Sequence, residues 1–158
     1  MIRCSFHLNG NALSTLSCPG LGFFPAYSGN EGGNRNNPSS ASIPDIGPLP
    51  PGLYYIVDRG RGGLLTMAKD GVASILSGSD RGVWFALYRQ DAVVDDLTFY
   101  EEVRRGNFRL HPAGYEGVSK GCVTLPRKSD FMLLRDFLLK TPTFKVGQLT
   151  AYGTIQVY

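Results

Sequence analysis

Short runs in which apolar and polar residues alternate recur along this chain of 158 residues. Alternation with a period of two is typical of a strand with one buried face. The clearest case is the C-terminal run 150–158, where every second residue from Ala151 to Val157 is small or apolar. Further strands are expected at 20–27, Leu53–Val57, Leu64–Ala68, Ala73–Leu76, Val83–Tyr88 and Phe108–His111. These are enough strands for a closed or nearly closed sheet.

The N-terminal segment, about residues 2–18, predicts a hairpin. Two extended runs flank an Asn-Gly pair, and both residues of that pair tolerate positive φ. A two-residue turn at the pair places Cys4 opposite Thr15, so Cys4 and Cys18 are not directly opposite and we expect no bridge between them. Three cysteines are an odd number, which favours thiols over a disulfide framework in a chain without an export signal.

One helix is expected at about 129–140. Ser129 is suited to cap its first turn, Asp130 lies near the positive end of the helix dipole, and Pro142 stops the helix. Its apolar face consists of Phe131, Leu134, Phe137 and Leu138. A second, short helical turn is expected in the sequence DDLTFYEEVRRG, residues 95–106.

A long loop is expected at about residues 28–51. This segment has almost no periodic apolar pattern and many turn-forming residues. Loops of this length in compact domains are usually binding loops, lids or disordered segments. The sequence leaves open whether this loop borders a binding site or is a surface excursion.

Composition favours one mainly β domain over residues 1–158. With 42% hydrophobic residues, the chain is long enough to bury one substantial core. Its 20 glycines and 10 prolines suit short strands joined by tight turns better than long helices. We therefore expect a single β domain with one or two short helices.

Charge and hydropathy exclude several classes of partner. The net charge is +3, and no run of lysine or arginine is dense enough to follow a phosphate backbone, so we expect no nucleic-acid partner. The longest strongly apolar run, Val83–Tyr88, is too short to cross a bilayer, and the N-terminus lacks the apolar core of a secretory signal. We expect synthesis in the cytoplasm without a signal peptide and no membrane span.

The stretch HPAGYEGVSKGC, residues 111–122, brings a histidine and a cysteine close together in sequence. A thiol of ordinary pKa needs a neighbouring base to become a nucleophile, and His111 is the natural base for Cys122. Glycines and a proline between them allow the chain to double back. Gly121 leaves room for an incoming carbonyl, and the backbone N–H groups near it can serve as oxyanion donors.

Two other interpretations of this stretch remain open on composition alone. His111 and Cys122 can be ordinary buried packing residues, as we expect for His7 and Cys4. A metal site is disfavoured because neither a Cys-x-x-Cys nor a His-x-x-x-His pair is present. We expect neither a metal nor a cofactor.

The string from His111 to Ser119-Lys120-Gly121-Cys122 resembles the active-site signature of the L,D-transpeptidase family. The stretches YSGNEGGNRNNP, PLPPGLYYIVDRG, RRGNFRLHPAG and SKGCVTLP, in this order, resemble the small L,D-transpeptidase-type effectors that bacteria inject into rivals by type VI secretion. Two positions depart from the wider family. Pro112 and Thr124 stand where many members have a glycine and an arginine.

This resemblance implies an L,D-transpeptidase-like β-sandwich or barrel with its active-site segment at 109–125. It implies an antibacterial effector that acts on peptidoglycan stem tetrapeptides as an L,D-carboxypeptidase, an L,D-transpeptidase or both, with exchange of D-amino acids. It also implies delivery by the type VI machinery, action in the periplasm of the target bacterium and a cognate immunity protein in the producer.

The resemblance also suggests roles for single residues. Cys122 attacks the stem carbonyl to give a thioester, and His111 takes the thiol proton and later protonates the leaving amine. Ser119 organises the turn or His111, unless it is a plain turn serine. Tyr115 and the loop 28–51 are expected to border the substrate. Candidate carboxylate-binding or neighbouring residues are Arg109, Thr124 and Arg127, although the two arginines can equally be solvated surface charges.

Two further function classes remain. A non-catalytic wall-binding module would keep the fold without the chemistry, but the presence of both His111 and Cys122 argues against it. Another cysteine hydrolase, such as a papain-like amidase, is disfavoured because in those enzymes the cysteine precedes the histidine along the chain.

Overall fold

The structure is a computed structural model of the chain, and it describes residues 1–59, 81–114 and 120–158. Within these residues the protein is a single, mainly β domain with one α-helix, which confirms the predicted fold class. The expected strands Leu64–Ala68 and Ala73–Leu76 lie outside the described residues.

The described residues form eleven strands, one helix and two short 3₁₀ turns. The strands are β1 (Ile2–Phe6), β2 (Ser14–Cys18), β3 (Gly22–Ala26), β4 (Gly52–Asp58), β5 (Phe85–Arg89), β6 (Leu97–Tyr100), β7 (Val103–Gly106), β8 (Arg109–Pro112), β9 (Val123–Leu125), β10 (Phe144–Val146) and β11 (Leu149–Val157). The helix is α2 (Lys128–Lys140), and the 3₁₀ turns are η1 (Pro38–Ser40) and η2 (Arg81–Val83).

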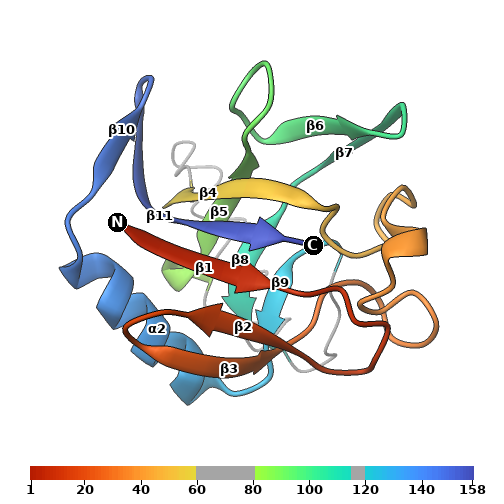
Figure 1. Cartoon of the computed structure of the whole chain (residues 1–158), viewed down its shortest axis with the longest axis horizontal. Coiled ribbons are helices and arrows are strands. Elements are labelled where there is room, and N and C mark those ends of the chain that lie inside the picture. Colours follow the sequence, from red (N-terminus) through yellow and green to blue (C-terminus); the bar gives the residue numbers. More distant parts are fainter. Residues whose placement is uncertain (60–80, 115–119) are drawn as a thin grey trace.

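The main sheet curls until its two edges meet. Its strand order is β3-β2-β1-β11-β4-β5-β8-β9, with β10 paired to β11, and the pairs β1–β11 and β8–β9 are parallel. At the closing edge, the backbone N–H of Tyr27 donates to the carbonyl of Thr124 at 2.9 Å, and the N–H of Thr124 donates to Tyr27 at 2.8 Å. The result is a nearly closed, barrel-like sheet (Figure 1).

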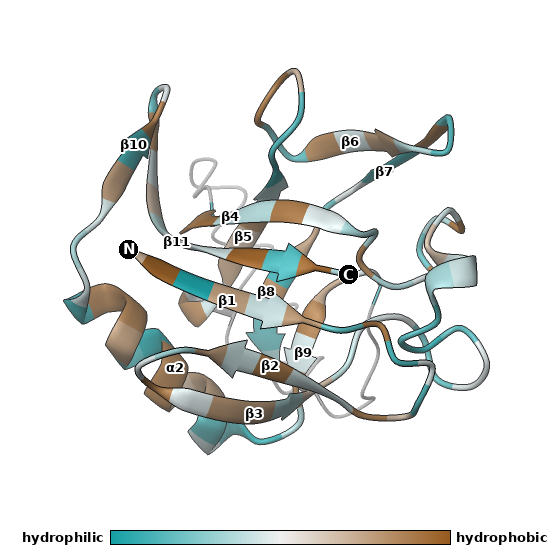
Figure 2. Cartoon of the chain, viewed as in Figure 1, coloured by the Kyte–Doolittle hydropathy of each residue, from teal (hydrophilic) through white to brown (hydrophobic). Residues whose placement is uncertain are grey.

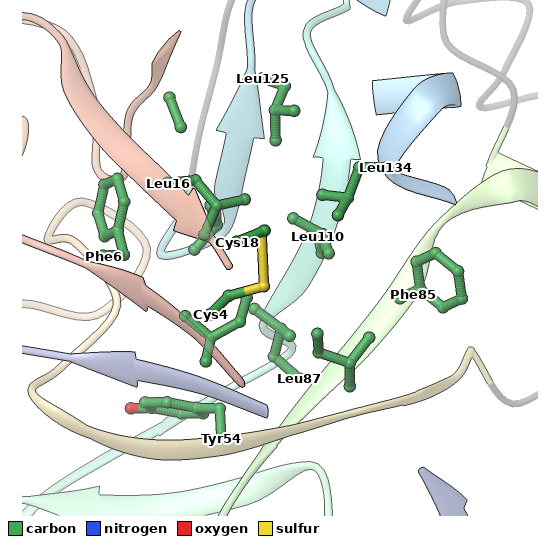
Figure 3. Packing of buried hydrophobic residues seen from close by; sticks show 14 of the residues in the cluster. Cys4, Phe6, Leu16, Cys18, Tyr54, Phe85, Leu87, Leu110, Leu125 and Leu134 are labelled. Atoms are coloured by element: carbon green, nitrogen blue, oxygen red, sulfur yellow. A yellow bond between two sulfur atoms is a disulfide. The ribbon is translucent and has the colours of Figure 1, made fainter. Parts of the chain in front are cut away.

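The hydrophobic core fills the inside of this curled sheet. Along β1, the buried residues Ile2, Cys4 and Phe6 alternate with more exposed neighbours, as expected for a strand with one buried face. The hydropathy colours of Figure 2 show hydrophobic and hydrophilic positions following one another along this strand. Strands β2, β4, β5, β8 and β9 add further buried side chains (Figure 3). The helix α2 packs against β8, β9 and β11 and contributes Phe131, Leu134 and Leu138 to the same core.

The expectation that Cys4 and Cys18 are not bridged is wrong. The register pairs Ser5 with Ser17, which places Cys4 opposite Cys18, and the two residues form a disulfide. The hairpin loop is longer than two residues because the side chain of Asn9 closes it, accepting from the N–H of Asn11 and donating to the carbonyl of Leu13, both at 3.0 Å. The longer loop shifts the register toward the second cysteine.

The expected helical turn at 95–106 is also wrong, because this segment is the hairpin β6–β7. Its two-residue turn consists of Glu101 and Glu102 at φ 48° and 66°. A turn with two positive φ values is normally made by Asn-Gly or Asp-Gly, so a Glu-Glu pair gives no hairpin signal in the sequence.

The predicted helix at 129–140 is confirmed, but its start differs. The helix begins at Lys128, and the N-cap is Arg127, which makes no side-chain capping bond, so Ser129 lies inside the first turn. Phe131, Leu134 and Leu138 are buried as predicted, whereas Phe137 is only partly covered.

The loop 28–51 is held by buried hydrogen bonds and is not a loose excursion. Asn36 is fully buried at φ 54°; its side chain accepts from the N–H of Ser28 at 2.8 Å and donates to the carbonyl of Asn11 at 2.7 Å. The hydroxyl of Ser28 accepts in turn from the N–H of Leu49 at 2.8 Å. These bonds tie the two ends of the loop to each other and its middle to the first hairpin.

Removing the disulfide is expected to destabilise the domain. The bridge closes a segment with a sequence separation of 14, and a loop of this size contributes about 3 kcal/mol by limiting the unfolded chain. Urea unfolding of the double variant Cys4→Ala/Cys18→Ala, compared with the wild type, measures this loss. Cys122→Ala is the control and keeps the full disulfide contribution. Three titratable thiols in the denatured, unreduced protein would contradict the assignment.

Candidate functional site

Parallel pairing of β8 with β9 brings His111 and Cys122 to one face of the sheet. In this register Leu110 lies opposite Val123, and His111 lies opposite Thr124. Leu110 and Val123 both belong to the hydrophobic core. Because successive residues of a strand point to opposite faces, His111 and Thr124 point away from the core. Cys122 directly precedes β9, and continuing the alternation by one residue sets it on the His111 side.

The hydrogen bonds of His111 define which ring nitrogen is basic. The side chain is only 5% exposed, and its Nδ1 lies 2.7 Å from the carbonyl oxygen of Pro112. A carbonyl only accepts, so Nδ1 carries the ring proton of the neutral imidazole. Nε2 is left as the acceptor nitrogen, and the hydroxyl of Thr124 lies 3.3 Å from it. The basic nitrogen thus faces β9.

The indole of Trp84 lies flat against the imidazole of His111. The ring centroids are 4.2 Å apart, and the planes differ by 24°. The guanidinium carbon of Arg59 lies 5.7 Å from the centroid of the Trp84 ring. The indole therefore contacts the candidate base and lies near a positive charge.

The thiol of Cys122 lies in a buried and partly polar environment. The residue is 7% exposed, and its Sγ lies 3.9 Å from the carbonyl oxygen of Asn107. Burial raises the pKa of the thiol above its ordinary value; hydrogen bonds from the backbone at Arg109 and Lys120, and the charge of Arg109, lower it by less. Cys122 is therefore a neutral thiol near pH 7 in the resting protein.

Gly121 is needed for both its backbone conformation and its lack of a side chain. Its φ is +89°, and a Cβ atom there would lie 2.6 Å from Nη2 of Arg105 and 3.0 Å from the ring of Phe108. The sequence predicted Gly121 as a position of close approach. In the structure, the groups that approach it belong to the protein's own Arg105 and Phe108.

Arg105 connects this point to the long loop. It is only 3% exposed, and its guanidinium donates to the carbonyls of Ala41, Gly47 and Pro48, the last two at 3.2 Å. The same guanidinium lies 5.3 Å from the ring centroid of Phe108. A single buried side chain thus joins β7, the loop 28–51 and the backbone next to the thiol.

The guanidinium of Arg109, a predicted carboxylate-binding group, is engaged by Asp96. Two parallel N–H···O bonds of 2.7 Å join the side chains, and Nη1 also donates to the carbonyl of Phe108 at 2.8 Å. A bidentate pair of this kind is among the stronger ionic contacts in proteins. A substrate carboxylate at Arg109 would have to compete with Asp96.

The remaining predicted residues fall into three groups: near His111, distant from Cys122, and outside the described residues. Thr124 lies beside His111, as described above, whereas Arg127 is exposed at the start of α2, beyond the end of β9 that is distant from Cys122. Tyr115 and Ser119 lie outside the described residues. Their predicted roles stay predictions.

Sequence reasoning missed Trp84, Asp96 and Arg105. Trp84 was part of a run predicted as a strand, and its position beside His111 follows from the pairing of Phe85 with Leu110. Asp96 and Arg105 lie in the segment for which a helical turn was expected. No local pattern identifies these three residues, because each reaches the site through long-range strand pairing.

Neither a metal centre nor a bilayer-spanning helix is found in the described part of the chain. Within residues 1–59, 81–114 and 120–158, no group of three or more His, Cys, Asp or Glu side chains could hold a metal ion. In the same ranges, no helix combines the length and the apolar character that a bilayer crossing requires.

Comparison with known proteins gives one family. A family model described as the Tlde1 domain matches residues 22–149, which is most of the chain and includes every described residue of the site. No curated protein matches the chain.

Replacing Gly121 by alanine is expected to destabilise the protein more than the backbone strain alone predicts. An L-residue at positive φ costs roughly 1–2 kcal/mol, and here the new Cβ also meets Arg105 and Phe108. Gly147→Ala is the matched control, because Gly147 has φ +58° but no atom within 4 Å of the added Cβ. Urea unfolding measures both variants. Equal losses of unfolding free energy in the two variants would show that the Arg105 side chain moves away from the new Cβ without an energetic cost.

Proposed function

The chain belongs to the Tlde1 domain family, a family of type VI secretion effectors that act on peptidoglycan, and we propose that it cleaves peptidoglycan stem peptides through a thioester on Cys122. The main support is the tautomer of His111. Because Nδ1 donates to the Pro112 carbonyl, Nε2 is the nitrogen that can take a proton. We infer that the Cys122 thiol, one residue before β9, lies on the same side of the sheet.

In the proposed acylation step, Nε2 of His111 takes the thiol proton as Sγ of Cys122 attacks the stem carbonyl. The attacked carbonyl belongs to the diamino acid that precedes the terminal D-residue. The new S–C bond gives a tetrahedral oxyanion, towards which the backbone N–H groups around Gly121 and Cys122 can donate. When the C–N bond breaks, the proton on Nε2 goes to the departing amine, and a thioester remains.

The acceptor that attacks the thioester decides the product. Water gives a shortened stem, which is L,D-carboxypeptidase activity. A D-amino acid gives an exchanged stem, and the amine of a neighbouring stem gives an L,D-crosslink. In each case His111 takes a proton from the acceptor and returns one to the sulfur. The first two outcomes remove donor stems from normal crosslinking.

Burial of Cys122 favours general-base catalysis over a preformed ion pair. Since burial raises the pKa of the thiol, Cys122 holds its proton in the resting state. Proton transfer to Nε2 then accompanies attack on the carbonyl. Thr124 donates to the same nitrogen in the resting state and has to yield it when the thiol proton is transferred.

Other predicted residues are assigned to substrate binding in this proposal. Tyr115 and the loop 28–51 border the stem, Ser119 organises the turn before Cys122, and Arg109 and Arg127 are candidate partners for stem carboxylates. The positive charge of Arg109 is shared with Asp96. In this proposal the Arg109 side chain binds a stem carboxylate only in competition with Asp96. The backbone of Arg109 supports the thiol through its hydrogen bond to the Cys122 sulfur.

The proposal places the activity in the periplasm of a target bacterium. Family membership supports peptidoglycan as the substrate and type VI secretion as the context. We further propose that the protein is delivered from the cytoplasm of the producing cell and that the producer holds a cognate immunity protein.

Substitution of the two central residues tests the chemistry. Cys122→Ala is expected to abolish shortening of a muropeptide with a tetrapeptide stem, because no thioester can form. His111→Ala is expected to reduce turnover by about 10²–10⁴-fold, the usual contribution of a general base. Mass spectrometry of the products, with and without added D-methionine, measures hydrolysis and exchange.

The other histidine provides the control for this experiment. His7→Ala is expected to keep the wild-type rate, because the side chain of His7 is exposed and stacks on Tyr158 outside the candidate site. Wall binding without stem shortening by the wild type would favour a non-catalytic module. Release of a different fragment would indicate another cysteine hydrolase.

The resting state of the thiol is tested by alkylation against pH. Only the thiolate reacts, so a raised pKa means that the rate of iodoacetamide labelling at Cys122 rises with pH and reaches its midpoint above the value of about 8.5 for an ordinary thiol. Mass spectrometry of the labelled peptide between pH 5 and pH 10 measures the rate, with the denatured protein as the reference. A labelling rate that is already maximal below pH 7 would show a preformed thiolate.

A further inference from the structure

We propose that Trp84 is a positioning residue for His111, whose indole holds the imidazole in the plane that directs Nε2 toward the thiol. This inference rests on the proposed function, in which Nε2 is the general base. Trp84 directly precedes β5, and the antiparallel register of β5 and β8 pairs Phe85 with Leu110. Continuing that register by one residue sets Trp84 opposite His111, as the stacked rings confirm.

Two hydrogen bonds at its edge do not by themselves fix the plane of the imidazole. They hold the ring at Nδ1, through the Pro112 carbonyl, and at Nε2, through the Thr124 hydroxyl. A ring held at two edge atoms can still tilt about the line that joins them. A flat indole at a centroid distance of 4.2 Å and an angle of 24° opposes this tilt. Trp84 thus supplies a constraint on the plane of the base that these two bonds lack.

The same stack favours the state that follows proton transfer. Once Nε2 has taken the thiol proton, a positive imidazolium lies on the face of the indole, and tryptophan is the aromatic side chain that best stabilises a cation in this position. Among the described residues, the charged or titratable groups of the candidate site are Arg59 beside the indole, and Cys122 with the Arg109–Asp96 pair whose charges act on its thiol. All of them remain when only Trp84 is replaced, so the substitution isolates the contribution of the indole.

The chain contains a matched stack at its other histidine. His7 lies 4.9 Å from Tyr158, centroid to centroid, with an angle of 7° between the rings, and both side chains are exposed. This pair has the same type of contact as Trp84 and His111 but lies outside the candidate site. Tyr158→Leu is therefore a control that removes a histidine stack without touching the base.

Kinetics of Trp84→Leu, Trp84→Phe and Tyr158→Leu on a muropeptide with a tetrapeptide stem test the proposal. Trp84→Leu is expected to lower kcat by roughly 10- to 100-fold, with KM within twofold of the wild type. It should also move the acid limb of the pH profile to lower pH by about half a unit, because the imidazolium loses its aromatic partner. Trp84→Phe should recover most of kcat, and Tyr158→Leu should match the wild type.

A second measurement does not depend on turnover. Nitrogen chemical shifts of the histidine side chains in the substrate-free protein report which ring nitrogen is protonated. In the wild type His111 should show a single Nδ1-protonated form, and in Trp84→Leu an average of both tautomers, with His7 unaffected. Wild-type kcat and an unchanged tautomer in folded Trp84→Leu would overturn the inference. Unchanged turnover in Cys122→Ala would instead reject the proposed function, and the nitrogen shifts would still decide the role of Trp84.

Discussion

The pairing of β8 with β9 decides which side chains share the face of the candidate site, and every proposed role depends on it. Side chains alternate along a strand, so a slip of one residue would turn the Cys122 thiol into the core and expose Val123 in its place. Two contacts oppose such a slip. Val123 is buried in the core, and the backbone of Thr124 is bonded on its other side to Tyr27, where the sheet closes. Closure of the sheet therefore determines the geometry of the site.

Burial is the second constraint, and its effects on the two reacting groups differ. It makes the thiol of Cys122 harder to ionise, which argues against a resting ion pair. It strengthens the contacts that orient His111, because a hydrogen bond to Pro112 and an aromatic stack on Trp84 are worth more away from bulk water. An imidazole held in one orientation and a thiol that keeps its proton at rest both suit the proposed proton transfer during attack.

The sequence predicts most accurately where one face of a strand is packed against the core. The alternation along β11 and the apolar run of β4 follow from burial alone, whereas the pairing of His111 with Cys122 as base and nucleophile stays a prediction. Register could not be predicted in the same way. The hydrogen bond from the Asn9 side chain to the carbonyl of Leu13 lengthens the loop of the first hairpin and brings Cys4 opposite Cys18. No pattern of residues in the sequence indicates this bond. The neighbours of the base likewise come from strands that are distant in sequence.

The hairpin β6–β7 shows why such long-range support escapes local reasoning. Its turn places two glutamates at positive φ, so local preference opposes it, and tertiary bonds offset that cost. Arg89 on β5 donates to the carbonyl of Phe99 in the hairpin at 3.2 Å and to that of Pro51 at 2.8 Å. The hairpin held in this way carries Arg105, which donates hydrogen bonds to the loop 28–51. Asp96, directly before the hairpin, forms an ion pair with Arg109. A segment whose local pattern is misleading thus supports the backbone on both sides of the thiol.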